Sequence, residues 1–130
     1  MPITALYAGL LTLLFLVLSF RTIGARRSAR VEIGDGSDQE LLRRMRVHAN
    51  FAEYAPLALV LMGLAESLKL PGIWLHAIGA VLLLGRAVHA YGLSQTPHVM
   101  QMRVFGMMAT FTALIASAAA CLVLSVLALR

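Results

Sequence analysis

The sequence predicts an all-α integral membrane protein, a bundle of four transmembrane helices. Of its 130 residues, 60% are hydrophobic and 13% are charged, whereas about 25% of the residues in a soluble domain are charged. The segments 2–20 and 104–129 contain no charged side chain, and roughly 20 apolar residues span a bilayer as a helix. These runs are too long for membrane barrel strands, which alternate over about ten residues.

Turn signals divide the chain, which forms a single domain over residues 1–130, into helices at about 3–25, 38–68, 73–93 and 99–129. The first apolar run has no charge ahead of Arg21 and exceeds the core of a signal peptide, so we interpret it as a retained helix. The glycine-rich segment 34–36 predicts a turn. Ser37 followed by Glu40 fits a capping box, which predicts Ser37 as the N-cap of the second helix.

The arginines predict the orientation of the bundle. The first connection and its flanks hold seven of them, whereas the second connection has only Lys69. Short loops rich in Lys and Arg stay in the cytoplasm, so we expect cytoplasmic first and third loops and periplasmic N- and C-termini. The arginines flank apolar runs without interleaved aromatic residues, which argues against a nucleic-acid partner.

Polar side chains converge on the predicted cytoplasmic end of the bundle. They are Arg46, Asn50, Glu53, Arg86, His89 and Arg103. The first three share one face of the second helix because they are four and three residues apart. The next two share a face of the third helix, and the last lies in the first turn of the fourth. A charge inside the bilayer costs about 2.5–3.5 kcal/mol, so we expect an ion pair between Glu53 and Arg86.

These polar residues allow a functional and a structural interpretation. Three arginines beside one carboxylate leave a positive cavity, which suits an anionic, water-soluble ligand from the cytoplasm. The structural interpretation has Arg46 and Arg103 as anchors that snorkel to the interface, and Asn50 as a helix–helix hydrogen bond. A metal site is not expected, because no two histidines lie four apart on one helix.

At the opposite end of the bundle, Glu66 and Lys69 are three residues apart. This spacing predicts a surface ion pair.

The motif Arg46-x-x-x-Asn50-x-x-Glu53-Tyr54-x-Pro56, followed by Gly85-Arg86-x-x-His89-x-x-Gly92, resembles the MAPEG family, membrane-associated proteins in eicosanoid and glutathione metabolism. Segments 5–8, 34–36 and 106–110 are similar to its bacterial inner-membrane branch, which resembles microsomal glutathione transferases. The resemblance covers nearly the whole chain. It implies a homotrimer in the bacterial inner membrane that binds glutathione, as co-substrate, between neighbouring subunits.

The resemblance also implies roles for individual residues. Glutathione-binding positions of the family match Arg46, Asn50, Glu53, Tyr54, Arg86, His89 and, less closely, Arg21. Arg103 matches the catalytic arginine that stabilises the glutathione thiolate. The implied function is a glutathione transferase or peroxidase acting on a lipophilic electrophile or lipid, which we expect to arrive from the membrane between the first and fourth helices.

Two positions depart from the family pattern. Met107 stands where some members carry a tyrosine, four residues after the catalytic arginine. Ala49 stands where prostaglandin-synthase-like members carry an arginine, so that activity is not expected. Two alternatives stay open. One is a non-catalytic scaffold that binds glutathione or lipid. The other is a small four-helix exporter, which is disfavoured because the first helix lacks an acidic residue.

Overall fold

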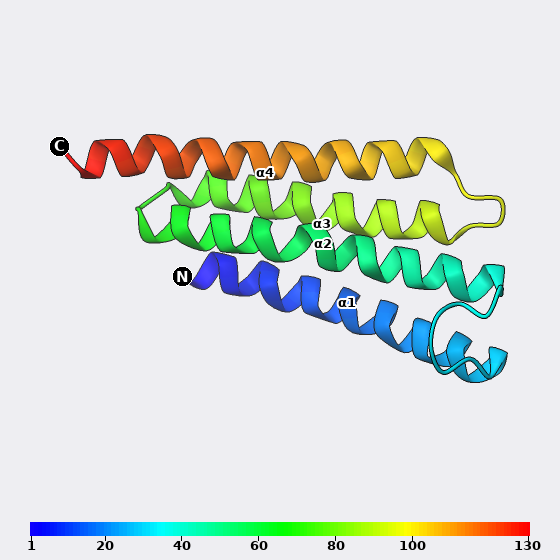
Figure 1. Cartoon of the computed structure of the whole chain (residues 1–130). Helices are drawn as coiled ribbons and strands as arrows, with labels where there is room; N and C mark the ends of the chain where they lie inside the picture. Colours follow the sequence, from blue (N-terminus) through cyan, green and yellow to red (C-terminus); the bar gives the residue numbers. More distant parts are fainter.

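The computed structural model describes residues 1–130 and contains four antiparallel helices (Figure 1). They are α1 (Pro2–Ala29), α2 (Gln39–Ser67), α3 (Gly72–Ser94) and α4 (Met100–Ala128). Each is long and apolar enough to cross a membrane. The predicted four-helix membrane bundle is therefore confirmed, with most boundaries within one residue of the predicted ones.

The connections alternate between the two ends of the bundle. The first and third lie at one end, and the second lies at the other end together with both termini (Figure 1). The end with the first and third connections also holds Arg86, His89 and Arg103 because of their places on α3 and α4. Which end faces the cytoplasm stays a prediction from the loop charges.

α1 ends four residues later than predicted. Arg26 and Arg27 occupy its last turn, where positive charge complements the negative end of the helix dipole. Arg30 closes the helix in a left-handed conformation with φ of 55°. Its N–H donates to the carbonyl of Arg27, and the N–H of Val31 donates to that of Arg26. The arginines that predicted a loop therefore extend the helix beyond its apolar run.

The predicted N-cap of α2 is wrong by one residue. Asp38 is the cap, and its Oδ1 accepts from the N–H of Leu41 at 2.8 Å. Ser37 lies in the preceding turn with φ of 62°, and its N–H donates to Oδ1 of Asp35. This turn leaves Asp38 in the extended conformation that an N-cap requires. Glu40 pairs with Arg43 and Arg44 instead of completing a capping box.

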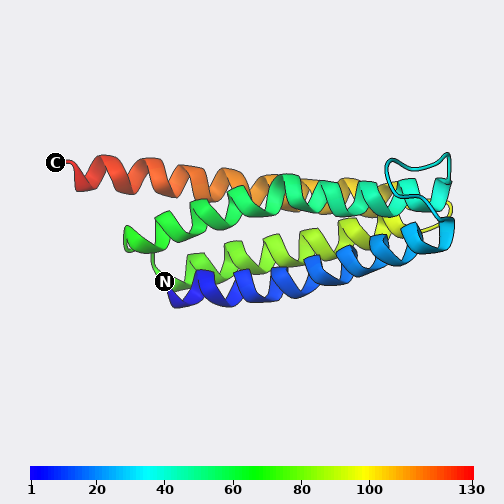
Figure 2. The ribbon, with the colours of Figure 1, turned by 60° about the horizontal axis from the view of Figure 1, so that its bottom comes forward.

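α1 and α4 lie on opposite sides of the bundle. α2 and α3 contact each other and both outer helices, but α1 and α4 make no contact (Figure 1). Figure 2 shows α4 extending beyond the other helices at its C-terminal end. We expected a lipophilic substrate to enter from the membrane between the first and fourth helices. Within one chain this route does not exist, because α2 and α3 separate α1 from α4.

α3 and α4 approach closely through glycines. A Cβ on Gly106 would lie 2.6 Å from the carbonyl oxygen of Gly85 and 2.5 Å from Cβ of His89. The buried face of α4 consists of small residues only: Gly106, Thr110, Ala113 and Ser117. Small residues let helix backbones pack closely in membranes. This contact brings α4 against the polar part of α3.

At the opposite end, Glu66 of α2 caps the start of α1. Its two carboxylate oxygens accept from the N–H groups of Ile3 and Thr4, at 3.0 and 2.8 Å. The predicted ion pair with Lys69 is wrong, because both ion pairs of the chain involve Glu40. The first N–H groups of a helix lack intrahelical partners and attract negative charge, so α1 competes successfully for this carboxylate.

Candidate functional site

Arg86 is the centre of the polar site. Its side chain is 1% exposed and lies between α2 and α4. Nε donates to Oγ1 of Thr110 at 2.8 Å, and Nη1 donates to Oδ1 of Asn50 at 2.8 Å and to its carbonyl at 3.4 Å. Nη2 donates to Sδ of Met107 at 3.2 Å. All these acceptors are neutral, so the guanidinium is hydrogen-bonded but its charge is not compensated.

One aromatic ring borders this guanidinium, and a second ring packs against the first. Cζ of Arg86 lies 5.7 Å from the ring centroid of Tyr54, a distance at which the ring face attracts a cation. Tyr54 in turn packs edge-on against Phe111 of α4, with centroids 5.7 Å apart. The ring of Tyr54 favours the positive charge without neutralising it.

The predicted ion pair between Glu53 and Arg86 is wrong. Glu53 is exposed, and no ion pair in the chain includes it. Three residues along a helix correspond to a rotation of about 300°, so Glu53 does not point where Asn50 points. The amide of Asn50 takes the position next to Arg86, and the carboxylate faces away from the bundle.

His89 and Arg103 form the second part of the site. Nδ1 of His89 lies 2.9 Å from the carbonyl oxygen of Arg103. Because a carbonyl only accepts, Nδ1 carries the proton, and Nε2 of the neutral ring is an acceptor. Nε2 of His89 and Nε of Arg103 are buried without a partner. Both residues line a cavity of about 200 Å³ together with Met100, Val104, Met107 and Met108.

Arg21 and Arg46 lie outside this network. Nη1 of Arg21 donates to Oγ of Ser94 at 3.2 Å and thereby links α1 to the last residue of α3. Arg46 is exposed on α2. The structure therefore brings together Asn50, Tyr54, Arg86, His89 and Arg103, and leaves Arg21, Arg46 and Glu53 around the edge.

Comparison with known proteins agrees with this architecture. Residues 4–123 match the MAPEG family. The chain belongs to that family. It is similar to the inner membrane protein YecN of Escherichia coli strain K12, with 40% identity over 113 residues, which are 87% of this chain and 85% of the relative. The protein of the same name from E. coli O6:H1 strain CFT073 shows the same identity and coverage.

Sequence reasoning did not assign a role to Thr110 in this MAPEG protein. Its hydroxyl accepts from Arg86 and donates to the carbonyl of Gly106 at 2.8 Å. A signal was present, because small residues at 106, 110, 113 and 117 repeat with helical spacing and mark the buried face of α4. Only the packed structure shows that this face meets Arg86.

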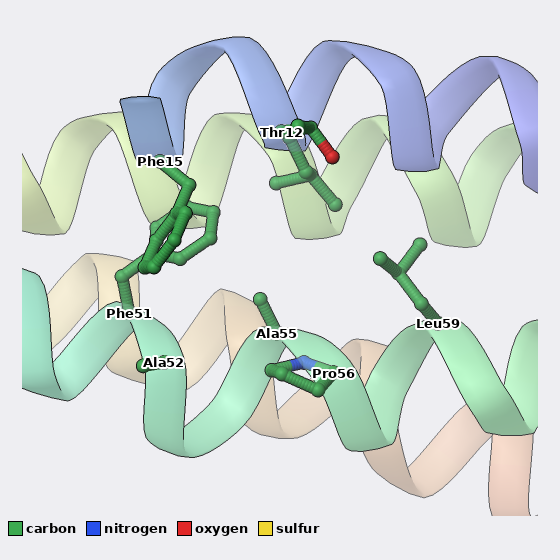
Figure 3. A pocket seen from close by; sticks show the side chains of 8 residues that line it. Thr12, Phe15, Phe51, Ala52, Ala55, Pro56 and Leu59 are labelled. Atoms are coloured by element: carbon green, nitrogen blue, oxygen red, sulfur yellow. The ribbon is translucent and has the colours of Figure 1, made fainter. Parts of the chain in front are cut away.

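A second, apolar groove of about 210 Å³ lies between α1 and α2 (Figure 3). Its lining residues are Leu11, Thr12, Phe15, Phe51, Ala52, Ala55, Pro56 and Leu59. α2 continues through Pro56, which has no N–H to donate to the carbonyl of Ala52. The proline that ends the helix-two motif of this MAPEG protein therefore faces a groove between helices, and no charged side chain lines that groove.

Proposed function

We propose that this MAPEG protein is a membrane-bound glutathione transferase or peroxidase of the bacterial inner membrane, which detoxifies lipophilic electrophiles. The buried guanidinium of Arg86 carries the proposal, because its own chain supplies only neutral acceptors. A buried charge is costly unless it is paired. An anionic ligand beside Arg86 and Arg103 supplies the missing charge, and glutathione carries two carboxylates.

The proposed chemistry depends on the thiolate of glutathione. The thiolate is the nucleophile, but an ordinary thiol has a pKa near 8.5 and is mostly protonated at neutral pH. A guanidinium keeps its charge and favours a nearby anion. In the proposed mechanism Arg103 lowers the pKa of the bound thiol, and about 1.4 kcal/mol is enough for one unit. The sulfur then attacks an electrophilic carbon, and the leaving group departs with its electron pair.

The binding site is proposed to lie between subunits of a homotrimer. The cavity at Arg103 measures about 200 Å³, below the roughly 300–1,000 Å³ of most ligand pockets. Arg46 and Glu53 are exposed on α2, where a neighbouring copy completes the site. We propose that Arg46, Asn50, Glu53, Tyr54, Arg86 and His89 bind glutathione there, with Glu53 facing its ammonium group and Arg21 at the edge.

Such an assembly also restores a membrane route for the lipophilic substrate. α1 and α4 do not touch within one chain, so the proposed route runs between α1 of one subunit and α4 of the next. The exposed surface of α4 is apolar, with Phe105, Ile115 and Leu122 each more than half exposed. A hydrophobic substrate dissolved in the bilayer therefore reaches the thiolate without crossing water.

Calorimetric titration of glutathione into the purified protein tests this proposal, with the ultraviolet absorbance of the thiolate followed in parallel. We expect Arg103→Ala to retain binding and to lose the thiolate signal, and Glu53→Gln to weaken binding. Arg130→Ala is the matched control, since it removes an exposed arginine from the other end of the chain. Absence of binding to the folded protein at millimolar glutathione would overturn the proposal.

A second candidate is a non-catalytic protein that binds glutathione or lipid. Met107 favours it, because this residue replaces a tyrosine hydroxyl and its sulfur is engaged by Arg86. Binding of glutathione without any thiolate signal would support this candidate. An exporter ranks below both, because Glu53 is exposed and not enclosed in the bundle.

A further inference from the structure

The first connection folds back onto the end of α1 and forms a basic pocket. The guanidinium of Arg26 donates to the carbonyls of Val31, Glu32 and Gly34, at 3.4, 3.3 and 2.9 Å. Figure 1 shows this connection, in cyan, beside the last turns of α1. This open pocket of about 420 Å³ is lined by Ile23, Arg26, Arg27, Arg30, Val31 and Glu32.

The pocket carries excess positive charge. Arg27 and Arg30 are exposed and form no ion pair. Glu32 is the single acidic residue in the lining, against three arginines. Arg26 is occupied with backbone carbonyls, so Arg27 and Arg30 are the cations available to a ligand.

The pocket lies along α1 next to the headgroup layer. The apolar run of α1 ends at Phe20, and Arg26 lies about 9 Å beyond it at 1.5 Å per residue. The hydrocarbon core is about 30 Å thick, and the polar layers bring the bilayer to roughly 40–45 Å. Each polar layer is therefore about 5–7.5 Å deep, and Arg26 lies just beyond its outer edge. Long arginine side chains reach back from there toward the lipid phosphates.

The same connection presents an apolar side chain. Ile33 is 91% exposed and precedes Gly34, whose carbonyl is held by Arg26. Basic residues beside an exposed apolar one are typical of segments that lie in the membrane interface. A solvated loop explains the arginines but gives Ile33 no apolar surroundings.

We propose that this pocket binds the phosphate of an anionic glycerophospholipid. Arg27 and Arg30 contact the phosphate, Arg26 holds the connection in place, and Ile33 enters the boundary of the acyl chains. The net positive charge favours an anionic lipid over a zwitterionic one, whose ammonium group is repelled. The proposal is independent of glutathione binding, since none of these residues belongs to the proposed glutathione site.

Fluorescence quenching in nanodiscs tests this proposal. The variant Ile33→Trp, combined with Trp74→Phe, places the sole tryptophan on the first connection. We expect brominated phosphatidylglycerol to quench it more strongly than brominated phosphatidylcholine at equal mole fraction. Arg27→Gln and Arg30→Gln should each reduce this preference about fivefold.

Lys69→Gln with Arg130→Gln is the matched control, because it removes the same charge at the opposite end of the bundle. Equal quenching by both lipids, or a loss of preference in this control as large as in a variant that combines Arg27→Gln with Arg30→Gln, overturns the proposal. Inorganic phosphate at constant ionic strength separates a lipid from a free anion. If it abolishes the preference, the pocket binds phosphate and not lipid.

Discussion

The guanidinium of Arg86 donates to the side-chain oxygen of Asn50 across 2.8 Å, from α3 to α2. This bond places a neutral amide where the sequence predicts a carboxylate. It holds the cation in a buried position and leaves its positive charge uncompensated. The predictions below test this arrangement and the contacts that support it.

Asn50→Asp should lower the affinity for glutathione without lowering the stability of the fold. The new carboxylate lies next to Arg86 and compensates its buried charge, so the free energy of unfolding should not fall. An anionic ligand then loses its main attraction, and the affinity for glutathione should fall about tenfold or more, which corresponds to 1.4 kcal/mol. Calorimetry and thermal unfolding in detergent measure both effects. Gln39→Glu makes the same change at an exposed position and should leave the affinity unchanged.

Thr110→Val should destabilise the bundle. Valine keeps the shape but removes the hydroxyl that accepts from Nε of Arg86, and a buried donor without an acceptor costs about 1–3 kcal/mol. Thr112→Val is the control on the same helix, since Thr112 is exposed and bonds only to the carbonyl of Met108. The free energy of unfolding of both variants in detergent decides the prediction, and equal losses would contradict it.

Gly106→Ala should separate α3 from α4. The added methyl group meets backbone atoms of Gly85 and His89 at 2.6 and 2.7 Å, and backbone cannot move as a flexible side chain does. Overpacking of this kind costs about 1–3 kcal/mol. Gly9→Ala serves as the control, because nothing lies within 4 Å of its added Cβ. Alanine is the better helix former there, so thermal unfolding should show no loss.

Glu66→Gln should loosen the start of α1. Its carboxylate accepts from the N–H groups of Ile3 and Thr4, and a neutral amide is a weaker acceptor at a helix N-terminus. Hydrogen exchange at the first residues of α1 should become faster, while exchange in α3 stays the same. Lys69→Gln should leave exchange at α1 unchanged. If Lys69→Gln accelerated exchange at α1 equally, the role of Glu66 as the cap would be refuted.

The site could be predicted only in part from the sequence. Spacing placed Arg86 and His89 on one face of α3, and the structure shows both buried. The prediction that Glu53 lies beside Arg86 was based on their opposite charges. It did not take into account the direction in which the Glu53 side chain leaves α2. The directions of Asn50 and Glu53 around α2 differ by about 60°. Which of them points into the bundle depends on how α2 is rotated against α3.

The helix ends could also be predicted only in part from the sequence. Asp35, Ser37 and Asp38 are all residues that favour turns and caps, so composition identified the region but not the cap. Ser37 adopts a left-handed conformation in the turn, so the next residue, Asp38, becomes the N-cap of α2. For Glu66 the sequence predicted Lys69 as the partner. It could not show the start of α1, because that contact joins residues more than sixty positions apart.

The sequence by itself determined that this protein is a four-helix membrane bundle, because apolar runs of this length have few other stable structures in a bilayer. The motifs that begin at Arg46 and Gly85 indicated the MAPEG family. It also determined which polar residues meet at one end, since alternate connections return the chain to the same side. Only the tertiary structure decided that Arg86 is buried among neutral acceptors. That outcome depends on helix rotation and on the glycine contact between α3 and α4, which no local pattern specifies.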